Sequence, residues 1–263
     1  VEVRQAKGLM DAFESRIAAG HRYGSFELDV DPAAEAFLRR GLLVTYRPAS
    51  AASPSSARPD LSPEEWLGFA ELAHTDPRRA FDAYSGRLLS TNGAVDWSDT
   101  GQLSFYADGY HRRIDERLGA AAPGSEMLTE LYVPRPRLED FLEEAAHEVR
   151  GGGVVYGAVR LIERDRQSFL AWAKESFACV ALNLHVDHTA AGIETAQQTA
   201  RLLIDLARRR GGSFLLTYHR WATREQVLDC YPQFPEFLQQ KLRYDPQERF
   251  QSEWYRHHRA MFA

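Results

Sequence analysis

Four stretches in the second half of this chain alternate polar and apolar side chains at the period of a β-strand. Because successive side chains of a strand point to opposite faces, every second residue of each stretch shares a face. Such a face would carry groups that can bind hydroxyls, accept protons and stabilise an oxyanion. The groups belong to Glu130 and Tyr132, to Tyr156 and Arg160, to Asn183 and His185, and to Tyr218 and His219 at the end of the fourth stretch.

Two interpretations of this polar face stay open at the level of the sequence. An antiparallel sheet can leave one face to water. A solvated face usually carries Lys, Glu and Thr, whereas aromatic rings interleaved with single polar groups suit a wall against a planar ligand. The pattern is therefore compatible with a binding site and with a solvated surface.

The elements that must position these groups follow the order strand, helix, strand, turn, strand, helix, strand. This order predicts an α+β fold with an antiparallel, ferredoxin-like sheet and helices on one face. The apolar residues of each strand would meet those helices. The predicted strands cover 128–133, 154–162, 179–186 and 214–218, the predicted helices cover 137–150 and 193–210, and a short helix or turn covers 168–174.

The first half of the chain is harder to interpret. Asp31 followed by Pro32 is typical of a helix start, so a short helix is predicted there. Residues 48–63 are rich in Pro and Ser and predict a flexible excursion. Aromatic residues at Trp97, Phe105, Tyr106 and Tyr110 precede a polar helix near 111–118. The predicted elements before them are helices at 9–19, 63–74 and 76–89 and strands at 23–30 and 42–47.

Composition excludes several classes of protein. The 263 residues suffice for a buried core, and a net charge of −5 gives no general attraction for nucleic acid or an anionic membrane. No apolar run reaches the ~20 residues of a membrane helix, and the first residues lack the apolar core of a signal peptide. Two isolated cysteines, Cys179 and Cys230, indicate a reducing compartment, so a cytoplasmic protein is expected.

Two short motifs resemble a phosphate-binding loop and a metal site, but their positions in the sequence predict neither. The glycines at 151–153 follow a predicted helix, whereas a phosphate-binding loop must open one, so they predict a helix C-terminus. His185 and Asp187 share a strand face, but His188 faces away and no third ligand is evident. The sequence therefore predicts no metal site.

Four segments, in this order, resemble one known family. They are ELYVPRPRLEDFL, YGAVRLI, ALNLHVDHT and the interrupted C-terminal series HRWATREQ, YPQFPEFL and YDPQERFQSEW. Together they resemble the substrate (cap) domain of FAD-linked oxidoreductases of the vanillyl-alcohol oxidase superfamily, in the branch of decaprenylphosphoryl-ribose, aldonolactone and alditol oxidases. The resemblance covers about residues 126–256.

The resemblance implies that the polar face lies over a flavin ring and encloses an alcohol or sugar, which is oxidised by hydride transfer to flavin N5. It implies a division into an N-terminal part of the cap domain (1–125), a ferredoxin-like core (126–243) and a segment that returns to a flavin domain (244–263). The resemblance implies that the catalytic groups are Arg160, His185 and Tyr218 or His219. It implies that the substrate is bound by Glu130, Tyr132, Tyr156 and Asn183. It also implies that three residues lie near FAD: Phe250, Ser252 and Trp254.

The chain also departs from this family. Ala158 stands where alditol oxidases carry a carboxylate, and Tyr218 and His219 replace a catalytic Lys, so a substrate identical to that of either relative is not expected. Residues 1–125 contain no glycine-rich, phosphate-binding loop, so FAD is not expected to bind this chain alone, and the chain alone is expected to be inactive.

Three hypotheses account for the missing flavin module. The chain, which does not begin with Met, is part of a longer enzyme; or it pairs with a separate flavin subunit; or it is a flavin-free protein that uses the sheet as a carbohydrate or lipid-sugar pocket.

Overall fold

The strands of this chain form one antiparallel sheet. The computed structural model describes residues 1–50, 61–95, 109–151 and 153–263. Within these ranges the sheet has seven strands in the order β1-β3-β2-β5-β6-β4-β7, and every neighbouring pair is antiparallel. The strands are β1 (Glu2–Gln5), β2 (Tyr23–Leu28), β3 (Arg40–Tyr46), β4 (Gly124–Pro134), β5 (Val154–Ile162), β6 (Phe177–Asp187) and β7 (Ser213–Phe214). The predicted α+β class with an antiparallel sheet is confirmed.

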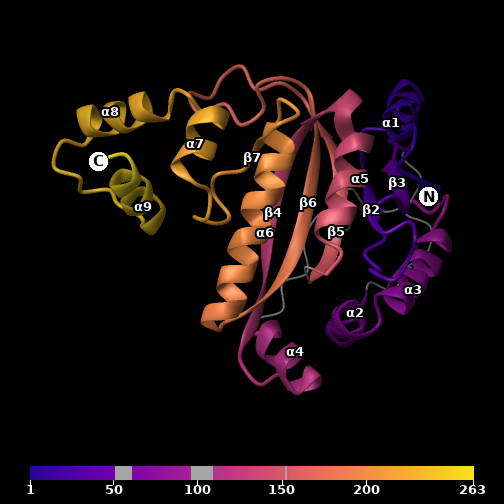
Figure 1. Cartoon of the computed structure of the whole chain (residues 1–263). Helices are drawn as coiled ribbons and strands as arrows, with labels where there is room; N and C mark the ends of the chain where they lie inside the picture. The colour runs from indigo at the N-terminus through magenta and orange to yellow at the C-terminus, as the bar shows by residue number, and fades with distance from the viewer. Residues whose placement is uncertain (51–60, 96–108, 152) are drawn as a thin grey trace.

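The second half of the chain contains the predicted ferredoxin-like unit. Its strand order β5-β6-β4-β7, with one helix after β4 and one after β6, is that of the β-α-β-β-α-β motif. The N-terminal strands extend the same sheet, because β2 pairs with the free edge of β5. The two halves therefore share one sheet (Figure 1).

Helices lie against both faces of this sheet. On one face, α5 (Leu138–Glu148) and α6 (Ala190–Arg208) lie side by side, and α1 (Leu9–Ala18) joins the same core. On the other face, α2 (Pro63–Thr75) contacts β5 and α4 (Tyr110–Leu118) contacts β4, with α3 (Pro77–Leu89) packed on α2. The sequence predicts these three helices, but it predicts helices on one face of the sheet only, whereas the structure places α2 and α4 against the polar face as well.

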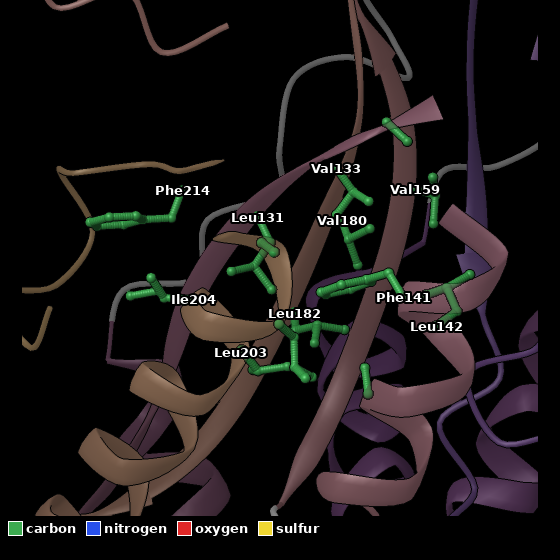
Figure 2. Close-up of a cluster of buried hydrophobic side chains, with 14 of the residues drawn as sticks. Leu131, Val133, Phe141, Leu142, Val159, Val180, Leu182, Leu203, Ile204 and Phe214 are labelled. Carbon is green, nitrogen blue, oxygen red and sulfur yellow. The ribbon is translucent and has the colours of Figure 1, made fainter. Parts of the chain in front are cut away.

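The core lies between the sheet and α5 and α6, as Figure 2 shows. Leu131 and Val133 of β4 and Val180 and Leu182 of β6 alternate with small or polar residues and point toward these helices. The helices supply Phe141, Leu142, Leu203 and Ile204, all fully or almost fully buried. The alternation predicted from the sequence therefore separates an apolar face from a polar face.

Local signals account for where the helices begin. Ser62 and Glu65 form a capping box at α2, and Pro63 occupies the first helical turn. Thr223 and Gln226 form a second capping box at α7 (Arg224–Cys230). The chain ends with α8 (Phe234–Tyr244) and α9 (Glu253–Met261), which lie beyond α7 and away from the sheet in Figure 1.

Several predicted elements differ from the observed ones. No helix forms after Asp31: Asp29 and Asp31 accept backbone hydrogen bonds and hold residues 31–39 in turns. The strand predicted at 214–218 ends at Phe214, so Tyr218 and His219 lie in a loop. Most of the excursion predicted at 48–63, and the aromatic residues Trp97, Phe105 and Tyr106, lie outside the described residues.

Among the described ranges, no helix combines the length and apolar character needed to cross a bilayer.

We expect Leu182→Ala to lower the free energy of unfolding by about 2–5 kcal/mol, because this fully buried side chain on a central strand would leave a cavity. Urea denaturation measures the change. Leu89→Ala is the matched control: this residue ends α3 and is 42% exposed, so its change should stay within about 0.5 kcal/mol. Equal losses in the two variants would contradict the assigned core.

Candidate functional site

Strand register brings the polar residues of the sheet into two neighbouring rows. Residues paired directly across strands share a face. Glu130 of β4, Ala181 of β6, Ala158 of β5 and Glu27 of β2 form one row. Small side chains therefore separate two carboxylates at the centre of the polar face.

The next row contains Tyr132, Cys179 and Arg160. Tyr132 is buried, packs on Trp172 and Phe177, and donates a hydrogen bond to Oε2 of Glu130 at 3.2 Å. Burial and the nearby Glu130 raise the pKa of the Cys179 thiol to about 12. This row therefore presents neutral hydroxyl and thiol groups beside one permanent cation.

Arg160 is that cation. Its side chain is partly exposed, and no residue in the described part of the chain forms a hydrogen bond or an ion pair with its guanidinium. Burial opposes its charge, but the nearby Tyr156, Tyr23 and Glu27 raise the pKa of the guanidinium. The Tyr156 hydroxyl donates to Glu27, and burial together with that carboxylate raises the pKa of Tyr156. Arg160 thus keeps its donors available at a polar surface.

Tyr218 joins this group from the loop after β7. Burial and the nearby Glu130 and Cys179 raise the pKa of its hydroxyl, while Arg160 acts in the opposite direction. The side chain remains 42% exposed. Tyr218 is therefore a neutral phenol beside the Glu130 carboxylate, open on one side.

His219 lies elsewhere. Its Nε2 is 3.3 Å from Oγ1 of Thr129, which points to the helix-covered face, and its Nδ1 accepts from the Trp221 backbone N–H at 3.4 Å. Burial lowers the pKa of His219 to about 4, so the ring is neutral near pH 7. Of the two alternatives at 218–219, the structure brings Tyr218, and not His219, to the polar face.

The other predicted site residues are spread along the chain. Asn183 lies on the polar face, and its Oδ1 is buried without a hydrogen-bond partner in the described residues. Ser252 caps α9, and Trp254 donates to the Leu216 carbonyl at 2.7 Å, so both have structural contacts within this chain. Phe250 is 80% exposed. The structure does not bring Phe250, Ser252 and Trp254 together with the polar rows.

A second group of side chains surrounds Glu126 and includes His185, which the resemblance implied to be catalytic; the sequence did not predict the group itself as a site. We call His74, His111, Glu126 and His185 the His–Glu cluster. Oε1 of Glu126 is 2.9 Å from Nε2 of His74 and 3.5 Å from Nδ1 of His185, and Oε2 is 2.8 Å from Nδ1 of His111. One carboxylate thus faces three imidazoles.

Charge and hydrogen bonding favour an ionised Glu126. Burial would raise its pKa, but the polar contacts with His185, His74 and Tyr110 outweigh burial and lower it. The same carboxylate raises the pKa of His185. The side chains of His74 and Glu126 are only 7% and 8% exposed.

The sequence did hold one signal for this cluster. The strand predicted at 128–133 begins four residues earlier, at Gly124, and its alternation places Glu126 on the face of Glu130. Glu126 is paired directly with His185. The contribution of His74 and His111 could not be predicted, because they come from α2 and α4, which reach the cluster only through tertiary packing.

A scan against protein-family models and a search of curated proteins found no match for this chain.

We expect neither cysteine to react with iodoacetamide at about pH 8 in the folded protein. Cys179 and Cys230 are 4% and 1% exposed, and burial raises their pKa values to about 12 and 11, which removes the reactive thiolate. Peptide mapping by mass spectrometry should find both labelled after denaturation. Labelling of Cys179 in the native protein would show that the centre of the polar face is open.

Proposed function

We propose that this chain forms the substrate-binding face of an FAD-dependent oxidoreductase that oxidises an alcohol or sugar hydroxyl, with FAD held mainly by a module outside these residues. The observation that carries the proposal is the Arg160 guanidinium, unpaired among the described residues and partly exposed between phenols and carboxylates. A cation at a polar face that has no partner in the described part of the chain favours an anionic or strongly polar ligand.

The hydrogen-bonding groups around Arg160 suit a polyhydroxylated substrate. Glu130 and Glu27 lie on either side of the small Ala181 and Ala158, and carboxylates in such positions accept hydrogen bonds from sugar hydroxyls. Tyr218 adds an exposed aromatic edge with a hydroxyl. Aromatic surface next to convergent polar groups is typical of small-molecule sites.

Two side chains have the chemistry to accept the proton released in alcohol oxidation and to stabilise the negative charge that develops on oxygen. Glu130 can accept the proton that the hydroxyl releases, either directly or through Tyr218, whose phenol lies beside it. Arg160 can stabilise the oxygen as negative charge develops on it. When bound, the flavin would supply the hydride acceptor at N5.

The C-terminal segment supports a docked second module. Tyr244 and Phe250 are 81% and 80% exposed, and they lie in the region expected to return toward the cofactor domain. Asp245 holds the loop between them by accepting the backbone N–H groups of Arg249 and Phe250 at 2.9 Å each. Large aromatic side chains on an ordered loop are typical of a surface that another protein module covers.

The first test is an absorption spectrum of the purified chain, recorded with and without added FAD, together with its intact mass. A colourless chain that gains little bound flavin is expected. A stoichiometric flavin band would contradict the proposal that the main FAD-binding module lies outside these residues. Tight binding of a sugar without any flavin partner would favour a carbohydrate-binding protein instead.

In the flavin-loaded enzyme, we expect Arg160→Ala to lower kcat by about 100-fold or more, with little change in thermal stability. Arg160→Lys should recover part of the loss, because the charge stays but the guanidinium geometry is lost. Arg164→Ala, in the exposed segment after β5, is the matched control. Anaerobic reduction of the flavin by substrate isolates the chemical step, and an unchanged rate in Arg160→Ala would remove Arg160 from the site.

A further inference from the structure

We propose that the His–Glu cluster binds one divalent transition-metal ion, best matched by Zn²⁺, with His74, Glu126 and His185 as ligands and His111 as the fourth. The ligand atoms of His74, Glu126 and His185 all lie within 4.8 Å of one another. The set of neutral imidazoles plus one carboxylate is one that Zn²⁺ favours. The proposed site is separate from the rows around Arg160.

The hydrogen bonding of His74 calls for a cation. Its Nδ1 lies 2.7 Å from the carbonyl oxygen of Ala70, so this nitrogen must carry the proton. In a neutral ring, the lone pair of Nε2 would then point at Oε1 of Glu126 only 2.9 Å away. Two lone pairs at that distance repel, and a metal ion bound by both atoms would remove the repulsion.

His185 has the same arrangement. Its Nδ1 faces Glu126 and its Nε2 faces Oδ1 of Asp187, both at 3.5 Å. His111 brings a third imidazole to the same carboxylate, and the rings of His74 and His185 lie only 4.9 Å apart. A divalent ion between these side chains would take their nitrogen and oxygen lone pairs as ligands.

The geometry matches shared ligands better than hydrogen bonds. The Nδ1 atoms of His111 and His185 are buried and lie near Glu126, yet neither is oriented to form a hydrogen bond. Ligands about 2.05 Å from a tetrahedral metal lie roughly 3.3 Å from each other. From Oε1 of Glu126, the distances to Nε2 of His74 and Nδ1 of His185, 2.9 and 3.5 Å, bracket that value.

Neighbouring groups fix the ligands in place. The Ala70 carbonyl orients His74, Asp187 faces the outer nitrogen of His185, and Tyr110 donates to Glu126. Such outer partners are typical of metal sites. Gly124 leaves the space for His185, since a Cβ at this position would lie 2.6 Å from Cε1 of that ring.

The position of the cluster indicates a structural role for the metal. His74, Glu126 and His185 come from α2, β4 and β6, and His111 of α4, whose Nδ1 lies 2.8 Å from Oε2 of Glu126, is the neighbour that would complete a tetrahedral shell. The metal would fasten α2 and α4 to the end of the polar face. Glu126 is four residues from Glu130, roughly 13 Å along the strand, so the metal would lie beside the proposed substrate face and shape it without entering the reaction.

The chain itself, without flavin, is sufficient for the test. Protein freed of metal by a chelator should bind one equivalent of Zn²⁺ in a competition titration with a chromogenic chelator, and its thermal unfolding should shift upward. Co²⁺ should give the absorption bands of a tetrahedral site. Mg²⁺, which prefers oxygen ligands, should produce neither effect. Absence of stoichiometric Zn²⁺ binding in the wild-type protein would overturn the proposal, whatever the variants do.

Conservative variants locate the site. His74→Gln, Glu126→Gln and His185→Gln should each weaken Zn²⁺ binding by more than about 100-fold, since even the partners of ligands contribute about 10–100-fold. His147→Gln, at an exposed histidine on α5, is the matched control and should bind normally. Unchanged affinity in the three ligand variants would mean that the metal binds elsewhere. An unchanged Co²⁺ spectrum in His111→Gln would overturn the fourth ligand.

Discussion

The pairing of β4 with β6 is the constraint on which the rest of this structure depends. Each strand is eleven residues long, and the two pair without interruption from Gly124↔Asp187 to Pro134↔Phe177. A shift of one residue would exchange the faces of the whole strand, turning Leu131 and Val133 outward and Glu130 inward. The apolar contacts with α5 and α6 therefore fix the polar face on the opposite side, because a one-residue shift would expose the leucines and valines.

The two ends of that polar face have different neighbours. Near Tyr132 the loop after β7 brings Tyr218 to the sheet, and the guanidinium of Arg160 remains accessible. Near Glu126, α2 and α4 close over the sheet, joined to each other by ion pairs between Glu64 and Arg113 and Arg117. The polar face of the sheet thus holds an accessible group of hydroxyl and charged side chains near Tyr132. Farther along the same face, near Glu126, it holds a partly buried group of imidazoles.

Sequence patterns predicted what depends on local periodicity. The alternation around Glu130, Tyr156 and Asn183 gave the correct faces, and the order of strands and helices gave the ferredoxin-like unit. The same patterns could not predict that side chains of Asp29 and Asp31 would replace a helix by turns, or that β7 would end after two residues. Nor could they place His74 beside Glu126, 52 residues away, since that contact depends on how α2 packs against the sheet.

The sheet ends at both sides in short strands, four residues in β1 and two in β7. A long, flat outer strand presents free amide and carbonyl groups on which another chain can assemble, and this is a common route to aggregation. In β1, Glu2 also forms ion pairs with Arg4 and with Arg16 of α1. Charged side chains therefore flank the short outer edge of this strand. At the opposite edge β7 pairs, within the described residues, only with Leu131 and Tyr132, so the rest of β4 is the longer stretch on which another strand could assemble.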